Sequence, residues 1–274
     1  MSLESEFVTQ NPEYKHILAY VRDSLGLEVV DWEHLTKVNL NIVATYIKSK
    51  VSPNSAATYI GILKGFLNRY SEEGVIPCKS YSKELIARRV PSQHIALTMD
   101  EIIRFDEYTP KTQTEKDVKI LFMRGCLTGM RLSDALLLTE DNIIGDTLTY
   151  VSQKTKVEVR QPVHARLVKY VKVQPKKSHD RKVINQVIRN ICKRLGMDEE
   201  VQLFVNGRLC KGPKYKFISQ HSSRRSYVTC LATNGVPIAV ISKLAGHSSV
   251  SMTDRYVCID TSKPGIKAME FFSR

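Results

Sequence analysis

Two arginines, two histidines and a tyrosine lie in short motifs between residues 128 and 256 of this sequence. Arg131 lies in the motif Thr-Gly-Met-Arg-Leu-Ser-Asp, His221 and Arg224 form the motif His-Ser-Ser-Arg, and His247 and Tyr256 follow toward the C-terminus. Arginine can neutralise a phosphate, histidine can move a proton near neutral pH, and a tyrosine hydroxyl can attack phosphorus as a nucleophile. As an ordered set, these residues predict chemistry on a phosphodiester.

The spacing of these residues supports the same chemistry. His221 and Arg224 are three positions apart on a predicted helix, so both side chains lie on one face and can bind one phosphate. Asp134, three positions after Arg131, is placed to hold its guanidinium group. Taken singly, the first pair is better explained by a capping histidine with an exposed arginine, and the second pair by a surface ion pair.

Lys154 is expected in a turn between two strands, in the segment Ser-Gln-Lys-Thr-Lys. A turn lysine is usually solvated, but a lysine on a mobile hairpin can also reach into a DNA groove and donate a proton. His247 follows a glycine at a predicted helix end, where a ligand can approach closely or the ring can interact with the helix dipole. Tyr256 is either a nucleophile or a half-buried tyrosine, a common environment for this residue type.

The charge balance favours a polyanionic partner. The 274 residues carry a formal net charge of +13, with a pI of about 9.4, and lysine and arginine release counterions from nucleic acid on binding. We find no apolar run of about 18 residues and no secretory signal, and therefore expect no membrane association. The six cysteines show no Cys-x-x-Cys pair and no zinc spacing, so we expect reduced thiols in a cytoplasmic protein without a metal site. If Met1-Ser-Leu is a cloning remnant, a natural N-terminal segment is missing.

Apolar residues recur at helical spacing through most of the chain. The first three predicted helices cover 11–26, 31–50 and the segment after Pro53, where Asn54 and Ser55 suit an N-cap. The motif Thr-Met-Asp-Glu at 98–101 is a capping box that begins a new helix. The later predicted helices are 116–126, 131–138, 164–173, 180–195, 219–233, 237–245 and 250–257.

Two segments break this helical pattern. Residues 75–96 lose the periodicity and contain prolines and basic residues, which indicates a basic linker. Between 142 and 163, short β-prone runs flank polar turns, which predicts a small antiparallel sheet with Lys154 near a hairpin. The expected organisation is a helical domain over 1–88, a linker over 89–97, and a second domain over 98–274.

The ordered set of motifs resembles the tyrosine recombinase (integrase) family. Thr-Gly-Met-Arg-Leu-Ser-Asp-Ala-Leu-Leu-Leu is similar to the first arginine box of that family, His-Ser-Ser-Arg-Arg-Ser-Tyr-Val-Thr to its His-x-x-Arg box, and Leu-Ala-Gly-His-Ser-Ser to its Gly-His box. Tyr256 follows at the distance expected for the family, and the strands around Lys154 are similar to its lysine hairpin. The segment from Asn54 to Tyr70 resembles the helical core-binding domain of these enzymes.

The resemblance implies a mainly α fold, with a helical, SAM-like core-binding domain and a mixed α/β catalytic domain that carries a small antiparallel sheet. It also implies transesterification, in which Tyr256 attacks the scissile phosphate and forms a 3′-phosphotyrosyl bond. His221 would act as the base, and Lys154 would protonate the leaving 5′-oxygen. No metal, nucleotide or other cofactor is required, because the covalent bond keeps the energy of the phosphodiester.

The remaining site residues are assigned by the same resemblance. Arg131 and Arg224 would stabilise the charge of the transition state, and His247 would hydrogen-bond a non-bridging phosphate oxygen. Asp134 would hold the guanidinium group of Arg131 in position. The basic or polar residues expected to contact DNA outside this set are Thr58, Lys64, Arg69, Arg88, Arg89 and Lys156.

The expected partner is double-stranded DNA in a bacterial or phage-host nucleoid. The resemblance implies a homotetramer on DNA, and it is compatible with a monomeric free protein and with accessory DNA-bending proteins. Apolar residues of the C-terminal tail, Ile266, Met269, Phe271 and Phe272, would pack on a neighbouring subunit. Two alternatives stay open at this point: a type IB topoisomerase, which rejoins the same strand, and a DNA-binding regulator of the same fold without activity.

Overall fold

The chain forms two compact units. The computed structural model describes residues 2–176 and 179–258. The first unit comprises the described residues up to Ser92 together with 204–209, and the second comprises the other described residues. The functional domains predicted above, 1–88 and 98–274 with a linker over 89–97, stay predictions. The expected tail contact through Ile266 to Phe272 lies outside the described residues.

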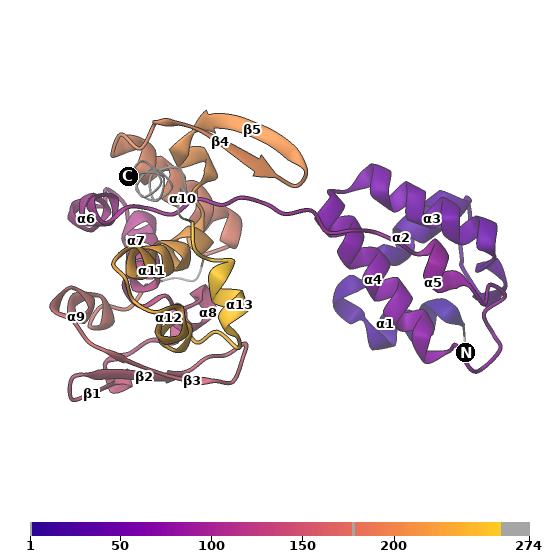
Figure 1. Ribbon diagram of the computed structural model, residues 1–274, viewed down its shortest axis with the longest axis horizontal. Helices are drawn as coiled ribbons and strands as arrows, with labels where there is room; N and C mark the ends of the chain where they lie inside the picture. Colours follow the sequence, from indigo (N-terminus) through magenta and orange to yellow (C-terminus); the bar gives the residue numbers. More distant parts are fainter. Residues whose placement is uncertain (1, 177–178, 259–274) are drawn as a thin grey trace, which may run out of the picture. The chain divides into compact units, whose positions relative to one another are not determined.

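The first unit is helical (Figure 1). Its α-helices are α1 (Leu3–Gln10), α2 (Ile17–Leu25), α3 (Lys37–Lys50), α4 (Pro53–Arg69) and α5 (Tyr81–Glu84), with 3-10 turns at Pro12–Tyr14 and Trp32–His34. Each α-helix contributes apolar side chains to one core. Phe7 of α1 packs edge-on against Phe66 of α4, with 5.1 Å between the ring centroids, so α1 is part of this core.

Local capping explains where two of these helices begin. Helix α1 was not predicted; it starts where the Ser2 side chain accepts a hydrogen bond from the backbone N–H of Ser5. The cap of α4 is Ser52, with Pro53 at the first helical position. The caps predicted for this helix, Asn54 and Ser55, instead lie inside it.

The predicted linker over 75–96 was wrong in its first part. Ile76, Cys78, Tyr81 and Leu85 are buried in the core of the first unit, and the segment includes the short helix α5. Burial of these side chains outweighs the breaking effect of the proline and of the polar residues between them. The residues after α5 continue without a helix or strand to the start of the next helix.

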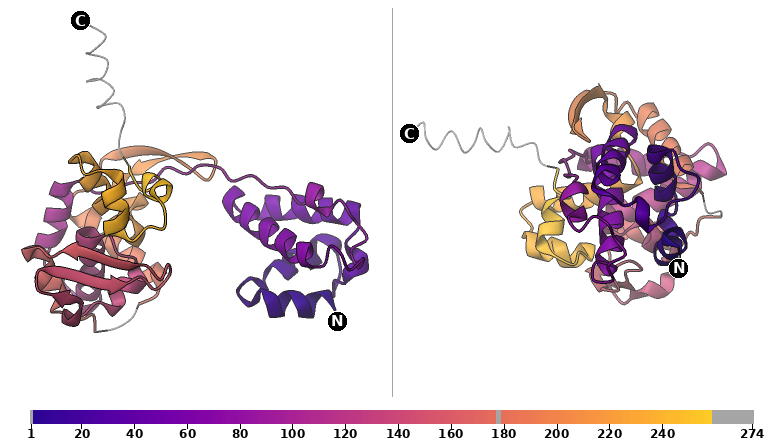
Figure 2. Two further views of the ribbon diagram at one scale, coloured as in Figure 1. Left: turned by 60° about the horizontal axis from the view of Figure 1, so that its bottom comes forward. Right: turned by 90° about the vertical axis from the view of Figure 1, so that its right-hand side faces the viewer.

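The second unit combines helices with two small sheets (Figures 1 and 2). Its α-helices are α6 (Met99–Glu107), α7 (Gln113–Thr128), α8 (Leu132–Leu137), α9 (Ala165–Val171), α10 (Arg181–Arg194), α11 (Gln220–Thr233), α12 (Ile238–Ala245) and α13 (Val250–Asp254), with 3-10 turns at Glu140–Asn142 and Lys214–Phe217. The strands are β1 (Ile143–Ile144), β2 (Thr147–Val151), β3 (Glu158–Pro162), β4 (Glu200–Val205) and β5 (Arg208–Pro213), of which residues 204–205 and 208–209 belong to the first unit.

The helices α7 and α11 pack against each other at the centre of the second unit. Gly125 on α7 lies directly against the Ser223 side chain on α11, and a Cβ atom at position 125 would clash with it. The preceding helix α6 begins with the predicted capping box: the Thr98 hydroxyl accepts from the Glu101 N–H at 3.3 Å, and the Glu101 carboxylate accepts from the Thr98 N–H at 2.7 Å. This prediction is confirmed.

The predicted small antiparallel sheet is also confirmed. Its strand order is β1-β2-β3, with Leu148 paired to Gln161 and Tyr150 paired to Val159. The hairpin β4–β5, on the other side of the helices in Figures 1 and 2, was missed, because no element was predicted between the helices expected at 180–195 and 219–233. Its turn is Asn206-Gly207, and both residues have positive φ, as a tight two-residue hairpin requires.

Two expectations from the sequence concern the cysteines, predicted to be reduced thiols, and the helices, none of which was predicted to span a membrane. Cys78, Cys126 and Cys192 are buried, and the other three cysteines are half-buried. None of the described helices is both long enough and apolar enough to cross a membrane.

Candidate active site

The side chain of Tyr256 lies among three other predicted site residues. Nε2 of His221 lies 2.8 Å from the phenol oxygen of Tyr256. The ring of His247 lies 4.7 Å from the tyrosine ring, centroid to centroid. The guanidinium carbon of Arg224 lies 5.4 Å from the centre of the same ring. The turn after α13 thus places the phenol against α11 and against the end of α12.

Arg224 is fully buried, yet most of its hydrogen-bonding capacity is unused. Its Nη1 donates to the carbonyl of Gly129 at 2.7 Å, whereas its Nε and Nη2 are buried without a partner. Gly129 ends α7 in the left-handed conformation, with φ +69°, and this turn directs its carbonyl to Arg224. An unmatched buried donor costs about 1–3 kcal/mol, so Nε and Nη2 mark a place for a missing acceptor.

His247 carries a second unmatched nitrogen. Its Nδ1 lies 2.8 Å from the Thr253 hydroxyl, and its Nε2 is buried without a partner. If the Thr253 hydroxyl donates to Nδ1, Nε2 carries the proton and can donate to an oxyanion. His247 directly follows Gly246, which caps α12 at φ +63° and lies so close to Val159 that a Cβ atom would come within 2.6 Å of its Cγ2.

Arg131 is held by a relay rather than directly by Asp134. Its Nη1 donates to the Ser152 hydroxyl at 3.1 Å, and that hydroxyl donates to the Asp134 carboxylate at 3.2 Å. The second oxygen of Asp134 accepts the N–H of Gln153 at 2.9 Å. Asp134 therefore orients Arg131 through the end of β2, and not through the direct pair that the spacing suggested.

The electrostatics keep both histidines neutral at physiological pH. Removal of the ring from water, followed by the charges of Arg225 and Arg224, lowers the pKa of His221 to about 4, although one side of the residue remains exposed. Burial, followed by the charge of Arg224, lowers the pKa of His247 to about 3. Burial and the charge of Arg131 lower the pKa of Arg224 to about 10, which leaves it protonated. A neutral His221 next to a phenol can accept its proton.

The structure does not bring Lys154 to Tyr256. Lys154 and Lys156 are exposed in the turn between β2 and β3, and no described contact joins either lysine to the residues around the phenol. The turn itself is ordered by two backbone hydrogen bonds: the Lys156 N–H donates to the Ser152 carbonyl at 2.8 Å, and the Ser152 N–H donates to the Val157 carbonyl at 2.9 Å. Ser152 thus connects this turn to Arg131.

The predicted DNA contacts of the first unit have different local environments. Lys64 donates to the Ser82 carbonyl at 3.0 Å, Arg69 hydrogen-bonds the side chain of Gln10, and Arg89 donates to the Thr58 hydroxyl at 3.2 Å. Arg88 and Arg89 are exposed. Lys64 and Arg69 therefore make contacts within the unit that the sequence alone did not suggest.

Several residues around the phenol were missed by the sequence analysis. Ser152 links Arg131 to Asp134, and its only signal was its place two residues before Lys154. Tyr227 lies against Gly129, where a Cβ atom would come within 2.5 Å of the tyrosine ring, and its hydroxyl donates to Gln161 at 3.0 Å. Arg225 lies over the Tyr256 ring, 4.8 Å from its centre.

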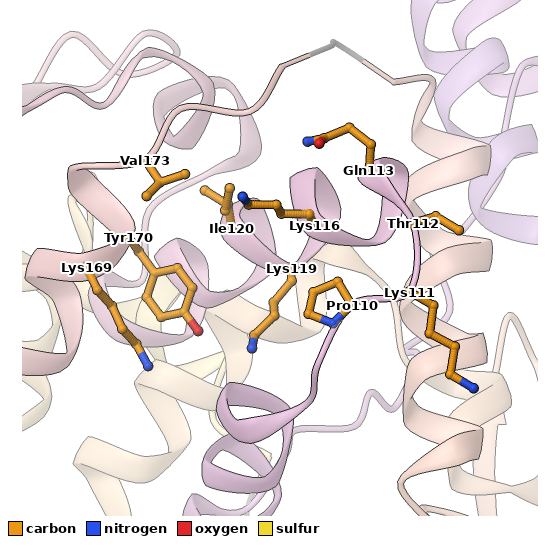
Figure 3. A pocket seen from close by; sticks show the side chains of 10 residues that line it. All are labelled: Pro110, Lys111, Thr112, Gln113, Lys116, Lys119, Ile120, Lys169, Tyr170 and Val173. Atoms are coloured by element: carbon orange, nitrogen blue, oxygen red, sulfur yellow. The ribbon is translucent and has the colours of Figure 1, made fainter.

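A cavity of about 580 Å³ lies elsewhere in the second unit, between α7 and α9 (Figure 3). Several lysines line it, but two of them are already engaged: Lys119 donates to the carbonyls of Asp106 and Tyr108 at 2.6 Å each, and Lys169 pairs with Asp106 at 2.7 Å. No predicted site residue lines this cavity. Within residues 2–176 and 179–258, no group of three or more His, Cys, Asp and Glu side chains could hold a metal ion.

Comparison with known proteins agrees with this geometry. Residues 96–263 match the model of the phage integrase family. The tyrosine recombinase XerC of Caldanaerobacter subterraneus subsp. tengcongensis is 26% identical over 257 residues, which cover 88% of this chain and 70% of that relative.

Two solved structures share the fold. A lambda integrase dimer bound to a COC′ core site aligns with a TM-score of 0.67 and 15% identity, over 95% of this chain and 96% of that chain. A lambda integrase tetramer bound to a Holliday junction aligns with a TM-score of 0.62 and 16% identity, over 91% of this chain and 71% of that chain. At this level of identity the likeness establishes the fold, and the predicted fold class is confirmed.

Proposed function

Because this chain belongs to the phage integrase family, we propose that it is a site-specific DNA recombinase that cuts and rejoins duplex DNA through a 3′-phosphotyrosine intermediate. One observation carries this proposal: a tyrosine hydroxyl is hydrogen-bonded to a neutral histidine, next to a buried arginine with two unmatched donors. A nucleophile, a base and donors suited to an anion therefore lie together.

The proposed reaction is a transesterification. The phenol oxygen of Tyr256 attacks the scissile phosphorus, and its proton passes to Nε2 of His221. The P–O5′ bond breaks, and the leaving 5′-oxygen takes a proton, so that the products are a 3′-phosphotyrosyl bond and a 5′-hydroxyl. Attack by the 5′-hydroxyl of another strand reverses these steps and restores a phosphodiester. The number of phosphodiester bonds is unchanged, so the proposal needs no metal ion or ATP.

The unmatched donors define the phosphate position. Nε and Nη2 of Arg224 would donate to the non-bridging oxygens, and Nε2 of His247 would donate to one of them. Arg131, oriented by Ser152 and Asp134, would add a second positive charge. Donors fixed in a dry site stabilise the extra negative charge of the pentavalent transition state without having to reorganise.

Lys154 is proposed as the acid that protonates the 5′-oxygen. Because it lies on an exposed turn away from the phenol, this role requires the turn between β2 and β3 to approach the bound DNA. The Ser152 hydroxyl and the Gln153 N–H both donate to Asp134, so the start of that turn is fixed. Lys154 itself is exposed to solvent.

The first unit is proposed as the core-binding domain. Its candidate contacts are the exposed Arg88 and Arg89 and the helix α4 with Thr58, Lys64 and Arg69, and Lys156 of the second unit would join them. The net charge of +13 supports a DNA backbone as the partner. Assembly into a homotetramer on DNA is proposed by analogy with the lambda integrase tetramer on a Holliday junction.

A nicked suicide substrate that carries the recognition site tests the activity. Cleavage near the nick releases a short strand, so rejoining fails and the covalent protein–DNA complex accumulates. Wild-type protein should form this complex, Tyr256→Phe should bind DNA without forming it, and Tyr227→Phe serves as the matched control that should still form it. Adduct formation by Tyr256→Phe at the wild-type rate would disprove the assignment of the nucleophile.

The same substrate separates the proposed recombinase from its two alternatives. A regulator without activity would form no covalent complex. A type IB topoisomerase would form one but would not transfer the strand to a second duplex. Transfer of the trapped strand to a different duplex that carries the site is the result we expect.

A further inference from the structure

One face of α11 holds the segment that carries the nucleophile. His221, Arg225 and Thr229 are spaced four residues apart, so their side chains lie above one another on the helix. Each contacts the segment Arg255–Cys258. Nε2 of His221 lies 2.8 Å from the phenol oxygen of Tyr256. The other two residues contact the backbone of the segment, and neither has a role in the proposed function.

Arg225 contacts both the backbone and the aromatic ring of this segment. Its Nη1 donates to the carbonyl of Arg255 at 3.0 Å, and its guanidinium carbon lies 4.8 Å from the centre of the Tyr256 ring. The side chain is 9% exposed, which means that the contact is made largely out of water. A cation over an aromatic face and a charge-assisted hydrogen bond are both stronger in such surroundings.

Thr229 binds the same segment one helical turn further on. Its hydroxyl donates to the Tyr256 carbonyl at 3.4 Å and accepts the N–H of Cys258 at 3.0 Å. Backbone groups on both sides of the phenol are therefore bound to α11. Fixing the backbone at these points restricts the rotation that would otherwise carry the phenol away from His221.

Arg225 and Arg224 are neighbours in sequence and both lie near the Tyr256 ring, but their hydrogen bonds go to different partners. Consecutive residues on a helix are about 100° apart around its axis. Arg224 thus reaches the carbonyl of Gly129 and keeps Nε and Nη2 unmatched, whereas Arg225 uses Nη1 on the carbonyl of Arg255. The first side chain is placed for a phosphate and the second for the nucleophile's own backbone.

We propose that Arg225 is a positioning residue that docks the segment Arg255–Cys258 on α11 and holds the phenol of Tyr256 against His221 before attack. This inference rests on the proposed recombinase function. Arg225 acts on the free tyrosine and does not touch the phosphate, so its contribution is to reduce the motion of the nucleophile in the uncleaved complex.

The proposal predicts an asymmetry between cleavage and rejoining. Before cleavage Tyr256 is held only by non-covalent contacts, whereas after cleavage the phosphotyrosyl bond itself holds it at the phosphate. Loss of Arg225 should therefore slow cleavage more than rejoining. Loss of Arg224, which stabilises the transition state shared by both directions, should slow both steps by similar factors.

The experiment compares first-order rates on saturating DNA. Cleavage is followed on the nicked suicide substrate, and rejoining is followed by adding an oligonucleotide with a 5′-hydroxyl to the trapped complex. For Arg225→Gln we expect cleavage to slow by about 10- to 100-fold, rejoining by less than about threefold, and DNA affinity to stay within about threefold of wild type. Arg225→Lys should recover most of the cleavage rate, because it keeps a charge over the ring.

Two further variants serve as controls. Arg104→Gln removes an exposed arginine that also donates to a backbone carbonyl, that of Leu195 at 3.0 Å, and should leave both rates unchanged. Thr229→Val replaces the hydroxyl with a methyl group of similar size and should slow cleavage by a smaller factor, in the same asymmetric way. Thermal unfolding of each variant shows whether the protein is folded, and Thr229→Val and Arg225→Lys still test the proposal if Arg225→Gln is not.

The outcomes separate this inference from the proposed function. Equal slowing of cleavage and rejoining, a loss of DNA affinity that matches the loss of cleavage, or a wild-type cleavage rate in Arg225→Gln would overturn the positioning role while leaving the recombinase assignment intact. Failure of the wild-type protein to form any covalent complex would instead overturn the proposed function.

Discussion

Two fully buried arginines of the second unit have opposite surroundings. Arg124, on α7, donates from Nε to the Tyr170 carbonyl at 2.9 Å, from Nη1 to the Ala135 carbonyl at 2.5 Å, and from Nη2 to the Val173 carbonyl at 2.9 Å. Arg224, on α11, donates only from Nη1, and its Nε and Nη2 have no partner. The exposed fraction is 0% for Arg124 and 1% for Arg224, so burial alone does not distinguish them.

We propose that Arg124 has a structural role and that Arg224 binds the phosphate, and the difference in their hydrogen bonds supports this assignment. In Arg124 every nitrogen of the guanidinium group is bound to the protein, and the side chain joins α7 to the end of α8 and to the end of α9. Arg224 is held at one point, and its Nε and Nη2 donate to no protein group. The cost of the unmatched donors is tolerated because a ligand with oxygen acceptors would remove it.

The largest expected effect concerns Arg224. Arg224→Ala should slow cleavage on saturating DNA by at least about two to three orders of magnitude, because a donor to the transition state is removed. Thermal unfolding should change little, since only one hydrogen bond to the protein is lost. A large loss of DNA affinity with an unchanged cleavage rate at saturation would contradict the assignment.

The next largest effect is expected on the cleavage rate of a Lys154 variant. Unlike Arg224, Lys154 is exposed, in the turn between β2 and β3. Lys154→Ala should slow cleavage by about 100-fold if this lysine protonates the leaving oxygen. A substrate with a 5′-bridging sulfur should restore the rate, because a thiolate leaves without a proton. Lys156→Ala is the matched control on the same turn. Equal defects of Lys154→Ala on the oxygen and sulfur substrates would argue against this role.

Substitution of Arg124 tests whether this arginine, with its complete set of hydrogen bonds, stabilises the fold. Arg124→Met keeps much of the side-chain volume but leaves the carbonyls of Tyr170, Ala135 and Val173 without their donor. We expect the free energy of unfolding to fall by about 3 kcal/mol or more. Urea-induced unfolding measures this, with Arg224→Met as the paired variant. If Arg224→Met destabilises the protein as much as Arg124→Met does, the unmatched donors of Arg224 do not mark a ligand site.

The smallest effect is a pH dependence of stability that arises at His247. Its pKa is lowered to about 3 in the folded protein, so the unfolded chain takes up a proton first as the pH falls below about 6.5. The contribution is fully present above about pH 6.5 and is lost as the pH falls toward 3. Between pH 7.5 and pH 5 we expect a loss of about 2 kcal/mol from this residue.

His247→Gln should remove this part of the pH dependence, as measured by urea-induced unfolding at the two pH values. His221, whose pKa is also lowered, should maintain a weaker dependence in the same direction, since its ring is partly exposed. An unchanged pH dependence in His247→Gln would show that the folded protein does not disfavour protonation of this ring.

Local sequence signals predicted much of the fold. The capping box of Thr98 and Glu101 and the left-handed Gly129 act through neighbouring atoms, so both could be identified without the rest of the chain. The hairpin β4–β5 carried such a signal as well, in Asn206-Gly207, and could have been predicted from it. The packing of Ile76 and Leu85 on the first unit could not, because it depends on the surface that α3 and α4 form together.

By itself, the sequence determined which chemical groups are available and in what order: the arginine, lysine, histidine and tyrosine motifs are present whatever the chain does around them. Only the tertiary structure decided which of these groups meet and which donors are left unmatched. Arg131 and Asp134 are close in sequence yet act through Ser152, and Arg224 depends on the distant carbonyl of Gly129. The physical reason is that burial and hydrogen-bond satisfaction belong to the packed surroundings, where helices and strands from distant parts of the chain exclude water around the same few atoms.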